Sequence, residues 1–281
     1  MSRRHLLRAV ATAALIALAV TLGTPAGTAR AQQPRPTLRV LFIGNSYTYV
    51  NDLPDVVAGL AASLPKGPAI EPTMLATGGM TLQWFWAAGK AASLIDGGGW
   101  NVVVLQEQSA LGAGTEVGDG RLSPPGLFHQ SVRNFVPRIR AVGATPVLMM
   151  TWARLARPDD QALLTSAYDD IGKELGVTVA PAGVAWQQAR QAWPDLSLHI
   201  ADGSHPNPTG TYLAACVLYA TLTGLDPRGA TAKVIGHPYS RQLQGLDMSQ
   251  EVTLVDLAPA LARRLQATAW RVATQRGLGK G

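Results

Sequence analysis

The chain of 281 residues contains a single cysteine, Cys216. An internal disulfide needs two cysteines, so none can form and the hydrophobic core has to supply the stability. Cys216 lies in a run of small and apolar residues, and we expect it to be an ordinary core residue of a helix. The sequence therefore excludes the class of small secreted scaffolds that disulfide bonds hold together.

Charged residues are also scarce, at 15% of the chain, and no stretch combines clustered basic residues with aromatic ones. Such stretches are typical of nucleic-acid binders, so we expect no nucleic-acid partner. The sequence has no HExxH motif and no carboxylate-rich loop, and we expect neither a metal ion nor a cofactor. His129 and His199 lack ligand partners at metal-site spacing, and we expect structural roles for both.

One long apolar run is present, and it lies near the N-terminus. It covers residues 9–22 and follows several arginines, and it is shorter than the about 20 residues that a membrane span needs. Ala29-Arg30-Ala31 then offers a cleavage site with small residues on both sides of an arginine. These features predict a secretory signal peptide over residues 1–31, and the paired arginines at its start are also compatible with twin-arginine export.

Export of the mature protein is the consequence. We expect a secreted or periplasmic protein without a stable membrane anchor after signal removal, because no cysteine for lipid attachment directly follows the apolar run. Removing residues 1–31 takes away four arginines and leaves 20 basic against 18 acidic residues, a net charge of +2 instead of +6. The mature protein is therefore close to neutral.

Residues 32–281 alternate between apolar runs and helix-like segments without a long linker, which predicts a single domain with a C-terminal helix. Five runs are expected to be strands: residues 38–44, 69–76, 101–106, 145–150 and 177–180. Continuous apolar strands separated by helices are typical of a parallel sheet that is buried on both faces. We therefore predict an α/β fold, a three-layer α/β/α sandwich around a five-stranded parallel sheet.

The sequence also predicts the character of three segments outside the strands. The pattern predicts one continuous helix over residues 81–95 and an irregular segment over residues 225–248. A final helix is expected over residues 249–274, with Pro259 as a kink or a restart.

Polar residues with catalytic chemistry lie beyond the expected strands. Ser46 comes two residues after the end of the first strand, where open parallel sheets place their sites, and Asp202 and His205 lie three residues apart in a loop. A serine hydroxyl needs an adjacent base to become a nucleophile, and an imidazole oriented by a carboxylate supplies one. The pattern predicts a triad of Ser46, His205 and Asp202, with local turn-forming roles as the alternative.

The same segments resemble the sequence blocks of the SGNH hydrolases, the GDSL esterase/lipase superfamily, whose fold is flavodoxin-like. Residues 44–48, Gly-Asn-Ser-Tyr-Thr, resemble the first block, and residues 202–207 resemble the fifth, Asp-x-x-His. Residues 76–81, Ala-Thr-Gly-Gly-Met-Thr, resemble the second block. The resemblance implies that the backbone N–H of Gly79, or alternatively of Gly78, donates to an oxyanion.

The third block departs from the family pattern. The family has Gly-x-Asn-Asp after its third strand, and that Asn side chain donates to the oxyanion, whereas residues 105–109 read Leu-Gln-Glu-Gln-Ser. Counting along the strand places Gln108 at the Asn position, and Gln106 is the competing residue. Glutamine carries the same NH₂ donor on a longer side chain. Glu107, between them, would be an odd neighbour for an anion.

The resemblance implies a serine esterase that works through an acyl-enzyme, with an oxyanion hole of Ser46, Gly79 and Gln108. Export and several tryptophans favour O-acetyl groups on carbohydrates, so the expected partner is a small-molecule or polysaccharide ester. Trp152, and Trp84 or Trp86, are candidate sugar-stacking residues, with core packing as the alternative. Two other functions remain open: a non-catalytic carbohydrate or cell-wall binding protein on the same fold, and a lipase or thioesterase.

Overall fold

The structure, a computed structural model, describes residues 35–111, 121–240 and 242–277. The described residues belong to one compact unit that begins at Arg35. The expected signal peptide over residues 1–31 lies outside the described residues.

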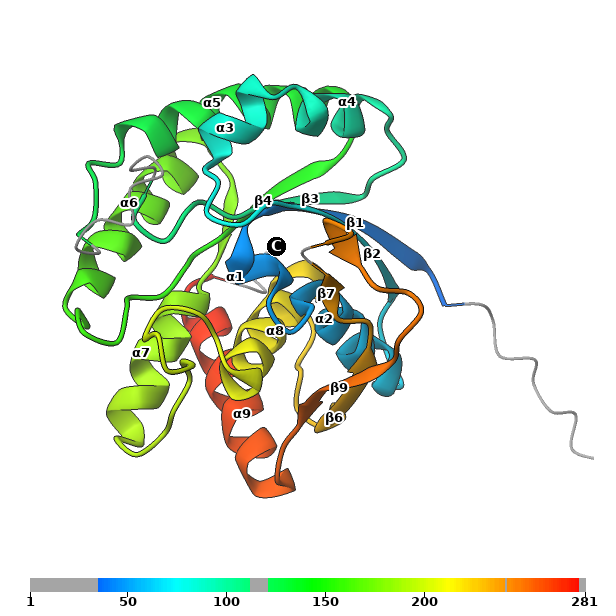
Figure 1. The fold of residues 1–281 in the computed structure, drawn as a ribbon, viewed down its shortest axis with the longest axis vertical. Coiled ribbons are helices and arrows are strands. Elements are labelled where there is room, and N and C mark those ends of the chain that lie inside the picture. The colour runs from blue at the N-terminus through cyan, green and yellow to red at the C-terminus, as the bar shows by residue number, and fades with distance from the viewer. Residues whose placement is uncertain (1–34, 112–120, 241, 278–281) are drawn as a thin grey trace, which may run out of the picture. The chain divides into compact units, whose positions relative to one another are not determined.

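A five-stranded parallel sheet forms the centre of this unit, as the sequence predicted (Figure 1). Its strands in chain order are β1 (Thr37–Gly44), β2 (Ala69–Ala76), β3 (Val102–Leu105), β4 (Thr145–Met149) and β5 (Thr178–Ala180). The spatial order is β2-β1-β3-β4-β5, so the connections run in opposite directions on either side of the β1–β3 pair. Open α/β sheets bind ligands at the carboxyl ends of the strands beside such a switch point. The segments that follow β1 and β3 are therefore the natural place for a site.

The strand side chains alternate between two buried cores, one on each face of the sheet. Val40 and Phe42 of β1 pack into one core, whereas Leu41 and Ile43 pack into the other. The helices that cover the first face are α2 (Leu53–Ser63), α7 (Ala182–Ala192), α8 (Pro208–Thr223) and α9 (Pro259–Gln275). Those that cover the second are α3 (Leu82–Ala87), α4 (Lys90–Asp96), α5 (Gly126–Ala141) and α6 (Asp160–Leu175). Burial on both faces explains why the strands are largely apolar, most clearly in β3, whose residues are all buried.

The single helix expected over residues 81–95 is two helices, α3 and α4, so this expectation is wrong. Gly89 separates them with a φ of +75°, a left-handed conformation that glycine adopts without steric cost. Thr81 caps the start of α3, because its Oγ1 accepts the N–H of Trp84 at 3.1 Å. A periodic apolar pattern continues across the break, which is why the sequence indicated one helix.

The segment before the last helix also differs from the expectation. Residues 249–258 do not begin a helix, because β9 (Val252–Asp256) pairs antiparallel with β6 (Lys233–Gly236). Helix α9 begins at Pro259. The preceding segment, expected to be irregular, also holds a short hairpin of β7 (Tyr239–Ser240) and β8 (Gly245–Leu246). The β-branched residues of β9 favour a strand, and a proline suits the first turn of a helix better than its interior.

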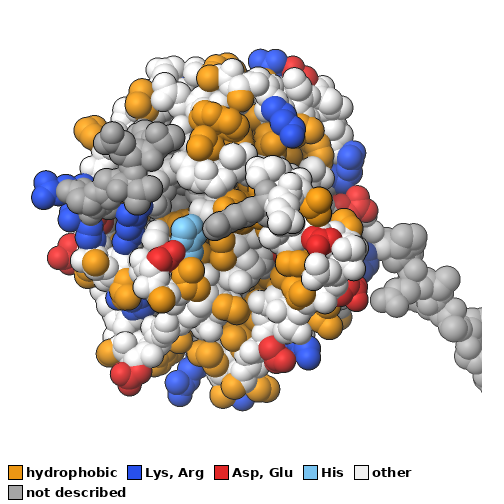
Figure 2. All heavy atoms as spheres, in the orientation of Figure 1, with side chains coloured by type: hydrophobic (Ala, Val, Ile, Leu, Met, Phe, Trp, Pro, Cys, Tyr) orange, Lys and Arg blue, Asp and Glu red, His pale blue; other side chains and the backbone are white. Residues whose placement is uncertain are grey.

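The surface of the unit is mixed in character. The face in Figure 2 carries both acidic and basic side chains, with hydrophobic side chains spread between them. Trp84 of α3 is one of the exposed large hydrophobic residues, at 44% exposure. Within residues 35–111, 121–240 and 242–277, no helix combines the length and the apolar character needed to cross a bilayer.

Candidate active site

Ser46 is the first residue of α1 (Ser46–Tyr49), the short helix that directly follows β1. Asn45 caps this helix, because its Oδ1 accepts the N–H of Tyr47 at 3.1 Å. Ser46 is 8% exposed. The turn after β1 thus holds the serine hydroxyl at the carboxyl edge of the sheet, beside the switch point.

The buried amide of Gln106 fixes this turn from the neighbouring strand. Its Oε1 accepts the N–H of Asn45 and the hydroxyl of Thr48, each at 2.8 Å, and its Nε2 donates to Asn45 Oδ1 at 3.0 Å. A Cβ on Gly44 would collide with both Thr48 and Gln106. Gln106 is 1% exposed, and its amide is fully used within the protein. It is therefore a structural residue, and the alternative that Gln106 completes an oxyanion hole is wrong.

Asp202 organises the loop that carries the histidine. Its Oδ1 accepts the backbone N–H groups of Ser204 at 2.8 Å and of His205 at 2.9 Å. Gly203 within this turn has a φ of +67°, which is the reason for a glycine there. The carboxylate of Asp202 therefore closes the turn with one oxygen and leaves the other for the His205 ring.

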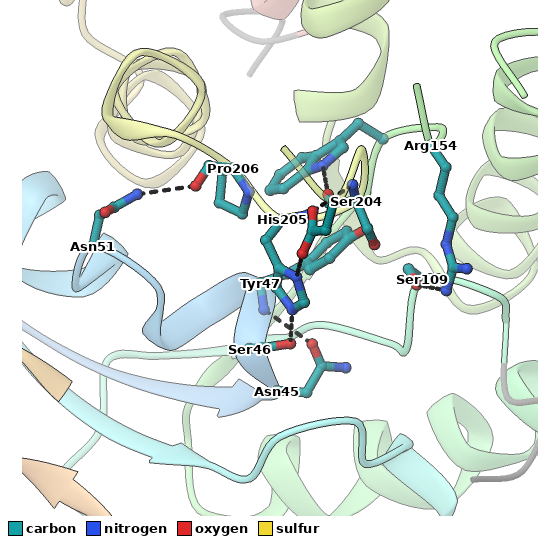
Figure 3. Close-up of polar contacts among 11 residues, drawn as sticks. Asn45, Ser46, Tyr47, Asn51, Ser109, Arg154, Ser204, His205 and Pro206 are labelled. Carbon is teal, nitrogen blue, oxygen red and sulfur yellow. Dashed lines mark hydrogen bonds and ion pairs between the residues drawn. The ribbon is translucent and has the colours of Figure 1, made fainter. Parts of the chain in front are cut away.

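The three side chains form one continuous line of hydrogen bonds (Figure 3). Nδ1 of His205 lies 2.5 Å from Oδ2 of Asp202, and Nε2 of His205 lies 2.8 Å from Oγ of Ser46. A carboxylate can only accept, so the ring proton belongs on Nδ1, and Nε2 presents its lone pair to the serine hydroxyl. The structure thus brings together the three residues that the sequence singled out.

The electrostatics keep Asp202 ionised. Burial acts to raise the pKa of its carboxyl, but hydrogen bonds from the His205 ring and from the backbone N–H groups of Ser204 and His205 outweigh burial, so the pKa lies below its usual value. The side chains of His205 and Asp202 are 32% and 43% exposed. Water therefore screens part of the attraction between them, while the geometry of the hydrogen bond is kept.

Aromatic residues support the histidine loop. The hydroxyl of Tyr47 lies 2.7 Å from Ser204 Oγ, and the indole N–H of Trp152 donates to the Ser204 carbonyl at 3.1 Å. Trp152 is 1% exposed, and its ring lies between those of Tyr47 and Trp186, with centroid distances of 4.7 Å and 4.0 Å. Both faces of the Trp152 ring are covered, so the expectation that it stacks on a sugar is wrong. Trp152 positions the loop instead.

Asn51 ties the same loop to the start of α2. Its Nδ2 donates to the Pro206 carbonyl at 3.2 Å (Figure 3). The same Nδ2 donates to Thr211 Oγ1 at 2.9 Å. Asn51 has a φ of +54°, a conformation in which asparagine is enriched among non-glycine residues. Sequence reasoning missed Asn51 and Tyr47, because neither has a spacing that relates it to the distant His205 loop.

The second sequence block follows β2 and lies next to the serine turn. The carbonyl of Met80 accepts Nδ2 of Asn45 at 2.9 Å. Gly79 has a φ of +74° and open space around the position of a Cβ, whereas a Cβ on Gly78 would lie 2.8 Å from the Tyr49 hydroxyl. Gly79 is therefore favoured by its backbone conformation and Gly78 by the lack of space for a side chain. Without side chains, the backbone at these positions can come close to a ligand.

Gln108 follows β3 and is half-buried. Its Oε1 accepts the N–H of Ala110 at 2.5 Å, within its own loop. With the oxygen engaged, the NH₂ end of this amide is the part that can face a substrate.

Two other histidines have structural partners. His199 is 5% exposed and its Nε2 lies 3.2 Å from the Ala153 carbonyl. Burial lowers the pKa of His199 to about 4, so it stays neutral at physiological pH. His129 contacts the Ala167 carbonyl at 2.8 Å. The part of the chain that the structure describes holds no cluster of His, Cys, Asp and Glu side chains fit to bind a metal ion.

Comparisons with known proteins give matches among solved structures. No family model matches the chain, and no curated protein does. A DUF4886 family protein from Bacteroides uniformis is 17% identical with a TM-score of 0.56, over 85% of this chain and 95% of that one. An acetylxylan esterase from Geobacillus stearothermophilus, solved as a catalytic mutant, is 13% identical with a TM-score of 0.55, over 70% of this chain and 98% of that one.

A lipase/acylhydrolase from Enterococcus faecalis is 16% identical with a TM-score of 0.51, over 69% of this chain and 100% of that one. At such identities the likeness concerns the fold. The resemblance to the SGNH hydrolases is thus confirmed at that level: this chain has the α/β fold of the acetylxylan esterase and the lipase/acylhydrolase that it matches.

Proposed function

We propose that this protein is a serine esterase in which Ser46 is the nucleophile, His205 the general base and acid, and Asp202 the residue that orients the imidazole. The observation that carries the proposal is the line of hydrogen bonds at 2.8 Å and 2.5 Å that joins Ser46 Oγ, the His205 ring and Asp202 Oδ2. This is the arrangement that acyl transfer by a serine requires.

The reaction begins when His205 Nε2 takes the hydroxyl proton of Ser46 while Oγ bonds to the ester carbonyl carbon. The carbonyl electron pair moves to its oxygen, and returns as the C–O bond to the alcohol breaks. His205 gives its proton to the departing alkoxide, which leaves an acyl group on Ser46. Water, deprotonated by His205, then attacks the acyl carbon. As the bond from that carbon to Ser46 Oγ breaks, His205 returns the proton to Oγ and the acid is released. Asp202 stabilises the imidazolium in both halves of the reaction.

The negative oxygen of each tetrahedral intermediate needs hydrogen-bond donors. The proposed donors are the backbone N–H groups of Ser46 and Gly79 and the side-chain NH₂ of Gln108. The open space around Gly79 and the engaged oxygen of Gln108 support this assignment. Each such donor contributes about 10²–10³-fold to the rate when it is aimed at the developing oxyanion.

The proposed substrates are O-acetyl groups on carbohydrates, and the proposed location is outside the cytoplasm, secreted or periplasmic. One matched structure is an acetylxylan esterase, and the N-terminal segment has the features of an export signal. Trp84 offers an exposed indole on α3, which begins three residues after Gly79. A second matched structure is a lipase/acylhydrolase, so a series of p-nitrophenyl esters from acetate to palmitate decides between short and long acyl groups.

The test is Ser46→Ala in the mature protein, with p-nitrophenyl acetate turnover and fluorophosphonate labelling as readouts. Both are expected to vanish in the variant. Ser93→Ala is the matched control, because Ser93 is an exposed serine of α4 whose hydroxyl donates to the Gly89 carbonyl within its own turn. Unchanged turnover in a folded Ser46→Ala protein would refute the proposal. A folded wild type that binds acetylated polysaccharide without turnover or labelling would favour the non-catalytic binding protein.

A further inference from the structure

Glu107 is a completely buried carboxyl directly beside the proposed oxyanion donor Gln108. It is 0% exposed and follows β3 by two residues. Its Oε1 accepts the backbone N–H of Gln108 at 2.6 Å, and Oε1 and Oε2 lie 3.3 Å and 3.2 Å from the backbone N of Leu82. One carboxyl group therefore bonds to the loop after β3 and to the first turn of α3.

The two segments that Glu107 joins carry two of the proposed oxyanion donors. Gln108 is the next residue along the chain, and Gly79 lies three residues before Leu82. The serine turn is connected to both segments. Asn45 Nδ2 donates to the Met80 carbonyl at 2.9 Å, and Gln106 Nε2 donates to the Glu107 carbonyl. The spacing between the donors thus depends on a small number of buried polar contacts, with the Glu107 carboxyl among them.

We propose that Glu107 is a positioning residue for the oxyanion hole: its carboxylate holds the segments of Gly79 and Gln108 at the separation that the tetrahedral intermediate needs. The inference rests on the proposed esterase function and deepens it. Glu107 does not itself face the oxyanion, because its oxygens are occupied by N–H donors of the protein. The Glu107 carboxylate thus stabilises the segments that carry the oxyanion donors, although its negative charge lies near an anionic intermediate.

The charge of Glu107 matters because an ionised carboxyl can accept at both oxygens, whereas a protonated one turns an oxygen into a donor. Burial raises the pKa of Glu107 to about 7, against the lowering effect of the Gln108 and Leu82 N–H groups. The titratable group that faces it from α6 is Tyr168, whose own pKa is raised by burial and then by the Glu107 charge, so the phenol stays neutral. Glu107 therefore changes its charge close to neutral pH.

The experiment is a double-mutant cycle of Glu107→Gln and Gln108→Ala, with kcat and KM for p-nitrophenyl acetate measured between pH 5.5 and 8.5. In Glu107→Gln, the new NH₂ group points a donor at a backbone N–H and loosens one of the two segments. We expect kcat at pH 8 to fall about 10- to 100-fold, which is part of what full loss of a donor costs. KM is expected to stay within about threefold, because the missing interaction forms only in the transition state.

Two features of the data identify a positioning role. The loss caused by Glu107→Gln should be at least about threefold smaller in the Gln108→Ala background, because part of the effect acts through Gln108. The ratio of wild-type to Glu107→Gln kcat should shrink towards one as the pH falls through about 7, because the wild-type residue then also becomes neutral.

Asp52→Asn is the matched control, since Asp52 is another buried carboxyl, 1% exposed, at the start of α2. It should keep wild-type kcat. Equal losses in both backgrounds, a ratio that does not vary with pH, or an effect confined to KM would overturn the inference. If Glu107→Gln does not fold, Glu107→Asp takes its place in the cycle, because it keeps the charge and shortens the reach. Activity that survives in Ser46→Ala would instead reject the esterase function itself, so the two failures are distinct.

Discussion

Replacing Asp202 with asparagine tests the orientation of the imidazole without removing the loop. Oδ1 of Asp202 accepts the N–H groups of Ser204 and His205, at 2.8 Å and 2.9 Å, and Oδ2 lies 2.5 Å from His205 Nδ1. An asparagine oxygen can keep the two backbone contacts, and its NH₂ group then faces His205. That NH₂ is a donor, so Nδ1 of His205 has to accept and the ring proton moves to Nε2. A protonated Nε2 cannot accept the proton of Ser46.

The alternative rotamer, with the amide oxygen towards His205, is unfavourable in this turn. It would place the NH₂ against two backbone N–H donors and lose both of their hydrogen bonds, at a cost of about 1–3 kcal/mol for each unpaired group. The turn therefore selects the rotamer that gives the wrong tautomer. In the general Ser-His-Asp scheme this change lowers kcat by about 10⁴-fold, or about 5.4 kcal/mol of barrier.

The solvent exposure of Asp202 and His205 reduces the expected fall in kcat. Asp202 is 43% exposed at its side chain, so water already screens part of the charge stabilisation of the imidazolium. The tautomer effect is geometric and does not depend on screening. We therefore expect Asp202→Asn to lower kcat for p-nitrophenyl acetate by about 10³–10⁴-fold, with a melting temperature close to that of the wild type.

The assay is initial-rate kinetics at pH 7.5 together with the rate of fluorophosphonate labelling, which follows the nucleophilicity of Ser46. Asp247→Asn is the control, because Asp247 forms a similar turn in which Oδ1 accepts the N–H of Ser249 at 3.1 Å. That variant should keep wild-type rates. A folded Asp202→Asn protein with kcat within tenfold of the wild type would refute the reasoning that Asp202 sets the tautomer.

Four further variants test the roles assigned to single residues. Gln108→Ala should lower kcat by about 10²–10³-fold at an unchanged melting temperature, whereas Gln106→Ala should lower the free energy of unfolding in urea by about 2–4 kcal/mol; equal behaviour of the two would contradict the assignment. Burial, then the charge of Asp55, raises the pKa of Asp52 to about 8, so the native state holds an extra proton between pH 4 and 8 and stability falls as the pH rises through that window. Asp52→Asn should remove this loss and raise the melting temperature at pH 8 by several degrees but not at pH 4, which thermal scans check. Trp84→Ala should raise KM for an acetylated xylo-oligosaccharide and leave p-nitrophenyl acetate kinetics unchanged. If the variant has the same kinetic constants as the wild type on both substrates, Trp84 has no role in substrate binding.

The sheet could be predicted from the sequence because several apolar runs each indicate a buried strand. Both faces of the sheet are covered, so the inner strand β3 is buried and apolar along its whole length. Even β2, which also holds Glu71 and Thr73, has the bounds that the sequence predicted. The C-terminal segment lacks this redundancy. β9 is short and packs as one member of a two-stranded ribbon, and a few apolar residues next to a helix can be taken for its first turn.

Part of the candidate site could also be predicted from the sequence, and part could not. Ser46, Asp202 and His205 could be found because each lies at a strand or loop end, where parallel sheets place polar groups. The contacts that hold them could not be found, because they join distant segments. Tyr47 reaches Ser204 across 157 positions. The two glutamines after β3 were also ambiguous, since both have the same donor group and only the fold decides which amide is consumed.

These contacts give a physical reason for the polar residues of segment 105–109, which departs from the third sequence block of the SGNH hydrolases. Three consecutive polar residues follow β3, and each one bonds to a different part of the site. Gln106 fixes the serine turn through Asn45 and Thr48, and Glu107 holds the first turn of α3. Gln108 is the oxyanion donor that we propose, because the side chains of Gln106 and Glu107 are engaged within the protein. The proposed donor Gln108 is therefore not isolated from its surroundings. The residue that we propose to position it and the residue that fixes the serine turn precede it directly in the chain, and we expect a change in any of the three to affect the other two.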